Sequence, residues 1–160
     1  LEFRRVLVRS AQAFLVPDVG KVRFIEISDI RKKLEGMAVR AACKNMTAGK
    51  VHELRILAEA FTEAAKTGNT ELTLQSNRVF RFAVYHYAEM PTLAAIIEQL
   101  WVRIGPCFNY LYPSSPELSL GYDYGDLLSS FENGDENGCE KAIYRTIDEG
   151  AGILLKQFNN

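Results

Sequence analysis

Residues 69–88 read NTELTLQSNRVFRFAVYHYA, and the apolar side chains in this stretch recur at the three- and four-residue steps of one helix face. The leading asparagine is a residue type that caps helix N-termini, and neither proline nor glycine interrupts the residues after it. Asn77 and Arg81 lie one turn apart inside the apolar stripe, beside Phe80 and Val84. The pattern predicts a long helix that carries an amide and a guanidinium toward the interior of the protein.

Helical spacing of apolar residues extends over almost the whole chain, and no segment shows the alternating pattern of a half-buried strand. Capping residues and helix breakers divide the chain into further predicted helices: about 3–15, about 23–44, one between Thr47 and Gly68, one from Pro91, about 117–132, and one from Asp135 to about Phe158. Long helices joined by short loops are typical of an antiparallel bundle. We therefore expect an all-α protein, an antiparallel bundle of six to seven helices.

The size and charge of the chain restrict its function. Its 160 residues suffice for one domain with a single core, and 48% hydrophobic with 24% charged residues is ordinary for a folded soluble protein. The apolar runs are too short to span a bilayer, and the first residues do not resemble a signal peptide. The formal net charge of -1, without a basic stripe, indicates that any contact with DNA belongs to another segment.

The three cysteines, Cys43, Cys107 and Cys139, are far apart in sequence and lack the spacing of a metal site. An odd number of widely separated cysteines favours reduced, buried thiols in a cytoplasmic protein. Cys139 falls on an apolar helix face, where a thiol acts as a small hydrophobic group.

Three other predicted helices also place a polar side chain in the middle of the apolar face, namely Arg31, Tyr124 and Thr146. An unpaired guanidinium in a protein interior is costly, so such groups are paired or face a ligand. Polar groups that converge from several helices predict a small-molecule site. The alternative is structural: the arginines pair with Glu35 or another acid, and Tyr124 is an ordinary core tyrosine.

Two short motifs resemble a known family. The segment DIRKKLEG at 29–36 resembles the opening helix of the C-terminal ligand domain in GntR-type transcription regulators of the FadR group, and NRVFR at 77–81 resembles its middle motif. The resemblance extends in helix order and spacing from about residue 25 to about residue 157. It implies an effector-binding helical domain over 25–160, with a linker or first short helix over 1–24.

The resemblance also implies what the domain works with. Members of the family contact DNA through a winged helix-turn-helix domain, which we do not find in these residues, and they act as homodimers in the cytoplasm, away from membranes. A small anionic effector is the expected ligand. Its binding would change how two attached DNA-binding domains are spaced.

In many members of this family an aspartate and a histidine four residues apart, with two more histidines on the last two long helices, hold a divalent metal. The matching positions here are Asn77, Arg81, Tyr124 and Thr146, so every ligand is replaced, one of them by a cation. We therefore predict no metal and no other cofactor. The two histidines that the chain does contain are predicted to lie on the surface.

A metal-free branch of the family, typified by FadR itself, binds long-chain acyl-CoA, and segments between residues 101 and 124 resemble that branch. Its last helix presents glycine, serine and tryptophan to the acyl-CoA, where this chain has Ile147, Gly150 and Leu154. This chain thus shares the general architecture of that branch but lacks these contacts with acyl-CoA. We expect the effector to be either a small carboxylate or an acyl thioester.

We expect Arg31 and Arg81 to hold the negative charge of the ligand through charge-assisted hydrogen bonds. We expect Asn77, Tyr124 and Thr146 to orient the ligand. We also expect Arg103 to supply a cation at the rim of the pocket, and Phe80 and Val84 to shape the pocket with apolar groups.

Two other classes of function give different expectations. A ligand-free helical dimerisation or interaction module would have a filled core in which both arginines close onto acids. An enzyme is not expected, because no cysteine has a histidine at a matching inward position. Asp123 and Asp126 flank a tyrosine on what we interpret as a solvated face.

Overall fold

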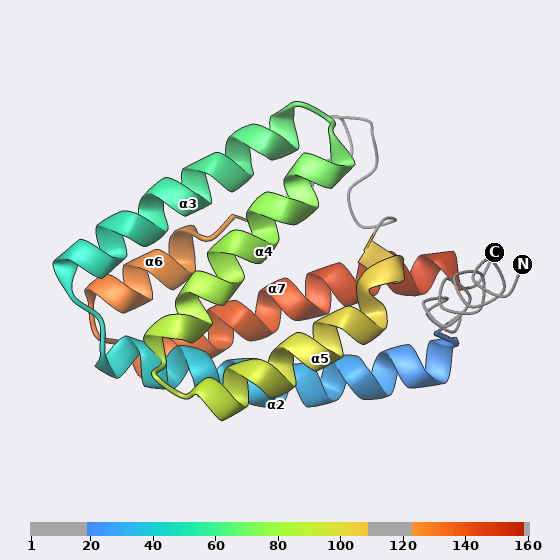
Figure 1. The fold of residues 1–160 in the computed structure, drawn as a ribbon, viewed down its shortest axis with the longest axis horizontal. Coiled ribbons are helices and arrows are strands. Elements are labelled where there is room, and N and C mark those ends of the chain that lie inside the picture. The colour runs from blue at the N-terminus through green and yellow to red at the C-terminus, as the bar shows by residue number, and fades with distance from the viewer. Residues whose placement is uncertain (1–18, 109–122, 159–160) are drawn as a thin grey trace, which may run out of the picture.

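A computed structural model describes residues 19–108 and 123–158, and these ranges form α-helices and no strand (Figure 1). The prediction of an all-α fold is confirmed, whereas the helix predicted over 3–15 lies outside the described residues. None of the helices in these ranges combines the length and the apolar character that a membrane crossing needs. The bounds are α2 Lys21–Lys44, α3 Ala48–Lys66, α4 Thr70–Tyr87, α5 Pro91–Phe108, α6 Gly125–Glu132 and α7 Glu136–Gln157.

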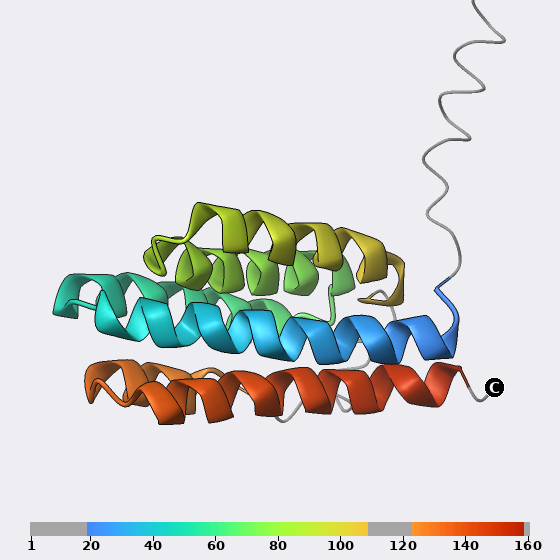
Figure 2. The same ribbon diagram turned by 90° about the horizontal axis from the view of Figure 1, so that it is seen from below.

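Helix α2 is the central element of the bundle. Helix α7 runs antiparallel to it and packs along one side, while α4 and α5 pack along the other (Figure 2). Helices α3 and α6 extend these two layers, with α3 against α4 and α6 against α7. Side chains from α2, α4, α5 and α7 therefore meet in one interior, and the buried charged residues Arg31, Glu35 and Arg81 lie there.

Local capping sets several helix boundaries, as the sequence predicted. The side chains of Thr47, Asn69 and Asp135 each accept a hydrogen bond from a backbone amide three residues later, at 3.2, 3.0 and 2.9 Å. Gly68 and Gly134 follow the ends of α3 and α6 with φ of 68° and 65°, a left-handed conformation that favours glycine. These caps account for the short, sharp connections between antiparallel neighbours.

The helix predicted over about 117–132 needs correction at Asp123 and Tyr124, which are not helical, so that α6 begins at Gly125. Residues 117–122 of this prediction lie outside the described ranges. The side chain of Asp123 accepts a hydrogen bond from the amide of Gly125 at 2.8 Å, and this turn competes with helix formation. Tyr124 is therefore the residue before the helix, not a residue in its middle. Its side chain is still buried, at 2% exposure.

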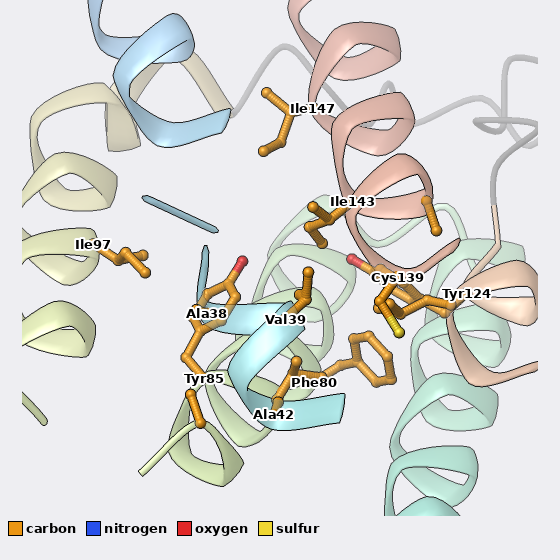
Figure 3. Close-up of a cluster of buried hydrophobic side chains, with 14 of the residues drawn as sticks. Ala38, Val39, Ala42, Phe80, Tyr85, Ile97, Tyr124, Cys139, Ile143 and Ile147 are labelled. Atoms are coloured by element: carbon orange, nitrogen blue, oxygen red, sulfur yellow. The ribbon is translucent and has the colours of Figure 1, made fainter. Parts of the chain in front are cut away.

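The apolar core lies beside these polar groups and joins the same helices (Figure 3). Phe80 of α4 and Ile143 of α7 are fully buried, and the Phe80 ring stacks on the Tyr124 ring with centroids 3.9 Å apart. Cys43 and Cys139 are also buried there as free thiols that contact each other, while Cys107 is half-buried. Burial raises the pKa of both contacting thiols, so they stay protonated at neutral pH.

Candidate functional site

Glu35, near the middle of α2, is the centre of the buried polar cluster and has 0% exposure. Its Oε1 accepts hydrogen bonds from Arg31 Nε at 2.7 Å and from Trp101 Nε1 at 2.9 Å. Its Oε2 accepts from Arg81 Nη2 and from the Tyr85 hydroxyl. Four donors from three helices thus satisfy one carboxylate, which compensates for much of its desolvation.

Arg81 is the most fully engaged side chain of the cluster, and only 3% of it is exposed. Besides its bond to Glu35, Nε donates to the Tyr85 hydroxyl at 2.8 Å and Nη1 donates to Thr146 Oγ1 at 2.7 Å. The Thr146 hydroxyl donates in turn to the carbonyl oxygen of Ile143 at 2.9 Å. Arg81 therefore ties α4 to both α2 and α7.

Arg31 is also buried, at 6% exposure, but forms fewer hydrogen bonds among the described residues. Its guanidinium carbon lies 4.9 Å from the ring centroid of Trp101 and 5.5 Å from that of Phe108, within cation–π range. Only Nε forms a hydrogen bond within the described ranges, to Glu35. Among the described residues, its two terminal nitrogens have no hydrogen-bond acceptor.

Asn77 and Tyr124 form a second buried pair, one turn from Arg81 along α4. The Tyr124 hydroxyl donates to Asn77 Oδ1, and Tyr124 and Asn77 are 2% and 6% exposed, respectively. Because the tyrosine ring is also stacked on Phe80, its hydroxyl is held in place. This pair fixes the orientation of the Asn77 amide.

The cluster carries a net positive charge. Burial by itself raises the pKa of the Glu35 carboxyl, but Arg31, Arg81 and the Tyr85 hydroxyl outweigh it and lower that pKa to about 2. Burial raises the pKa of Tyr85 well above its usual range, so its hydroxyl stays neutral. In the part of the chain that the structure describes, the buried charged side chains are Arg31, Arg81 and Glu35. Two positive charges and one negative charge give the cluster a net charge of +1.

A small cavity of about 30 Å³ borders the cluster. Four of the predicted ligand-binding residues line it together, namely Arg31, Asn77, Arg81 and Thr146. Ser28 also lines it and was not predicted. This volume is enough for a water molecule or two but not for a metabolite. The other described lining residues are apolar or glycine: Phe24, Trp101, Phe108, Ile147, Gly150, Ala151 and Leu154.

The other predicted ligand-binding residues do not line this cavity. Tyr124 does not line the cavity but donates a hydrogen bond to Asn77, which does, while Phe80 and Val84 are fully buried in the apolar core. Arg103 is exposed on α5 and lies outside the lining. Its position is that of a residue at the surface of the bundle.

Sequence reasoning missed several members of the cluster. Tyr85 lies four residues after Arg81, the same spacing that joins Arg31 to Glu35, so helical periodicity carried a signal for it. Trp101 and Ser28 carried no such signal. Their roles depend on how α5 and α2 are packed, which the sequence alone does not specify.

The residues at the family's metal-ligand positions do come together here, as two hydrogen-bonded pairs: Arg81 with Thr146 and Asn77 with Tyr124. Within the described ranges no three histidine, cysteine, aspartate or glutamate side chains gather in a way that could hold a metal ion. The absence of a cofactor stays a prediction. His52 and His86 are exposed, as predicted.

Residues 26–149 match the model of the FCD domain. The chain belongs to this family. It is 40% identical over 155 residues to the HTH-type transcriptional regulator McbR of Escherichia coli strain K12, a match that covers 95% of this chain and 70% of that protein. Its fold is similar to the solved structure of E. coli McbR/YncC, with a TM-score of 0.81 and 37% identity over 89% of this chain and 69% of the other.

These matches confirm the family resemblance inferred from the two motifs. The chain is an FCD domain of the GntR family of transcription regulators, and its helical fold is the one found in McbR. The family is regulatory and not enzymatic, in agreement with the expectation from the sequence.

Proposed function

We propose that this FCD domain senses a small anionic metabolite inside the bundle and transmits its binding to DNA through a separate domain, in a homodimer. The observation that carries the proposal is the residual charge of +1 in a buried cluster that borders a polar cavity. An uncompensated charge in a protein interior is unfavourable. An anionic ligand removes that excess, so it binds the cluster with favourable electrostatics.

The small volume of the cavity supports a role in signalling. Because about 30 Å³ cannot hold a metabolite, the ligand has to move the side chains or helices that line the cavity. The lining residues come from α2, α4, α5 and α7, so binding shifts the preferred arrangement of these helices. A ligand that favours one of two arrangements is the physical requirement for coupling to a distant domain.

We assign the roles within the site by the hydrogen bonds that each residue has left to form. Arg31 offers its terminal nitrogens to the ligand, and Arg81 supplies charge while anchoring the cluster. Asn77 orients the ligand, which is a small carboxylate or an acyl thioester. The Thr146 hydroxyl already donates to Ile143, so Thr146 acts on the ligand by positioning the Arg81 guanidinium. Arg103 contacts only a ligand that extends out of the bundle.

The rival function is a dimerisation or interaction module that binds no small molecule. One observation favours it, namely that both arginines close onto Glu35 and the interior is nearly filled. Under this alternative the cluster only specifies how the helices pack. The two functions differ in whether any anion binds.

The test compares Arg31→Gln with Arg78→Gln. Arg31→Gln leaves the Arg81–Glu35 pair intact and brings the cluster from +1 to zero, whereas Arg78 forms a half-exposed pair with Glu98 on the outside of α4. Thermal unfolding is followed with a panel of organic anions, and native mass spectrometry identifies anything that co-purifies. We expect at least one anion to raise the Tm of the parent and of Arg78→Gln, but not that of Arg31→Gln. If no anion shifts the parent and nothing co-purifies, the module without ligand is the correct function.

A further inference from the structure

Among the buried side-chain oxygen and nitrogen atoms of the described residues, the Ser28 hydroxyl is the one without a hydrogen-bond partner. Ser28 is 5% exposed, lies one turn before Arg31 on α2, and lines the cavity. Buried hydroxyl groups are almost always bonded, because an unbonded one is unfavourable. This hydroxyl is therefore a donor available to whatever enters the cavity.

The lining of the cavity changes character along its length. On α7 it runs from Thr146, which is bonded to Arg81, to Leu154, eight residues or about 12 Å farther along the helix. Helix α2 runs in the opposite direction, so Phe24 lies toward the same end as Leu154, and its ring is 5.5 Å from that of Phe158. One end of the cavity is cationic, the other is apolar, and Ser28 lies between them.

This arrangement limits the charge that a ligand can carry. One negative charge offsets the excess of +1 at the cationic end. A second carboxylate would lie toward Phe24 and Leu154, where the described lining residues offer no cation. Desolvating that group without a partner is strongly unfavourable. Dicarboxylates are thus disfavoured relative to monocarboxylates of equal length.

Resting on the proposed function, we infer that the ligand is a monocarboxylate with an apolar body. Its carboxylate accepts hydrogen bonds from Arg31 and from the Ser28 hydroxyl, and its apolar body lies along Phe24 and Leu154. Ser28 is thereby a ligand-binding residue in addition to those at the family's motif positions.

The experiment measures binding of butanoate, pentanoate, hexanoate, adipate and 1-hexanol to the purified protein by calorimetry at constant ionic strength. Affinity is expected to rise about fourfold per methylene from butanoate to hexanoate, since each buried methylene contributes about 0.8 kcal/mol. Hexanoate should bind at least tenfold more tightly than adipate, which has the same number of carbons, and more tightly than the uncharged alcohol.

Ser28→Ala provides the second readout. It should weaken hexanoate binding on the order of tenfold, as expected for a lost hydrogen bond to a charged group, while the Tm of the ligand-free protein stays equal or rises. Ser76→Ala is the matched control, because the Ser76 hydroxyl donates to the carbonyl oxygen of Leu72 at 2.9 Å on the outside of α4. This control should leave hexanoate binding unchanged.

The outcomes separate the two proposals. If adipate binds more tightly than hexanoate and Arg31→Gln abolishes its binding, a sensor of anions exists but the monocarboxylate inference is wrong. The inference is also wrong if Ser28→Ala lowers the Tm of the ligand-free protein and leaves hexanoate affinity unchanged. If none of the organic anions tested in either experiment binds, both the proposed function and this inference are overturned.

Discussion

Removal of the Glu35 carboxylate should reveal how strongly the bundle depends on its buried ion pairs. In the parent, Arg31 and Trp101 donate to Glu35 Oε1, and Arg81 and the Tyr85 hydroxyl donate to Oε2. All four donors lose this acceptor in Glu35→Ala. The net charge of the buried cluster rises from +1 to +2. Removing one partner of a buried ion pair typically lowers the free energy of unfolding by about 3–5 kcal/mol. For a domain stabilised by about 5–15 kcal/mol, this removes from about a fifth to all of the stability.

The same variant allows chemical rescue, which distinguishes an electrostatic effect from a packing effect. The atoms removed by Glu35→Ala are a methylene and a carboxylate, which correspond to acetate. Acetate at ten times its Kd would restore about 1.4 kcal/mol, whereas chloride at equal ionic strength should restore less. Urea denaturation gives the free energies, and circular dichroism shows whether the variant is folded.

The control for this experiment is Glu98→Ala, which breaks the half-exposed pair with Arg78 and should cost at most about 1 kcal/mol. A loss below about 1 kcal/mol in Glu35→Ala would refute the reasoning. So would equal recovery with acetate and chloride, because the carboxylate site would then have no specific affinity for a carboxylate.

Two further predictions concern acid stability and the core. Because the pKa of Glu35 is lowered to about 2 in the folded state, its contribution of about 3 kcal/mol is present above the unfolded pKa of about 4.3 and is lost as the pH falls toward 2. The difference in unfolding free energy between the parent and Glu35→Ala should therefore shrink over that interval, and a constant difference would contradict the assignment. Phe80→Ala removes a fully buried ring stacked on Tyr124 and should cost about 3–5 kcal/mol in urea denaturation. A loss under about 1 kcal/mol would mean that this stack is not part of the stabilising core.

Much of the fold is accessible from the sequence because local signals determine it. Thr47, Asn69 and Asp135 cap their helices with their own side chains, so the starts of α3, α4 and α7 need no tertiary information. The error in the predicted start of α6 also has a local cause. At that point the Asp123 side chain bonds the amide of Gly125, and a helical wheel does not represent this competing turn.

The site was predictable in part, because polar residues in apolar stripes have to converge somewhere. Arg31, Asn77, Arg81 and Thr146 do line one cavity. Which atoms meet, however, depends on the register between helices. The bond from Arg81 to Thr146 joins positions 65 residues apart in sequence, and no periodicity along one helix contains that information.

Ser28 shows the same limit more sharply. A serine within a helix ordinarily bonds a carbonyl one turn earlier, so its presence in α2 carries no signal. Only the packing of the neighbouring helices leaves its hydroxyl buried and without a partner in the described ranges. Arg103 illustrates the reverse case, since a position near the apolar stripe of α5 is exposed once the helix is packed.

The two buried arginines differ in how many hydrogen bonds they form among the described residues. Arg81 uses all three of its guanidinium nitrogens in hydrogen bonds, to Tyr85, Thr146 and Glu35. Arg31 uses only Nε within the described ranges and otherwise rests on aromatic rings. A ligand at one hundred times its Kd contributes about 2.7 kcal/mol, enough to rearrange one hydrogen-bonded side chain but not a whole ion-pair network. Under the proposed function, we therefore expect a metabolite at ordinary concentrations to rearrange Arg31 and to shift the neighbouring helices only as far as the intact Arg81–Glu35 pair allows.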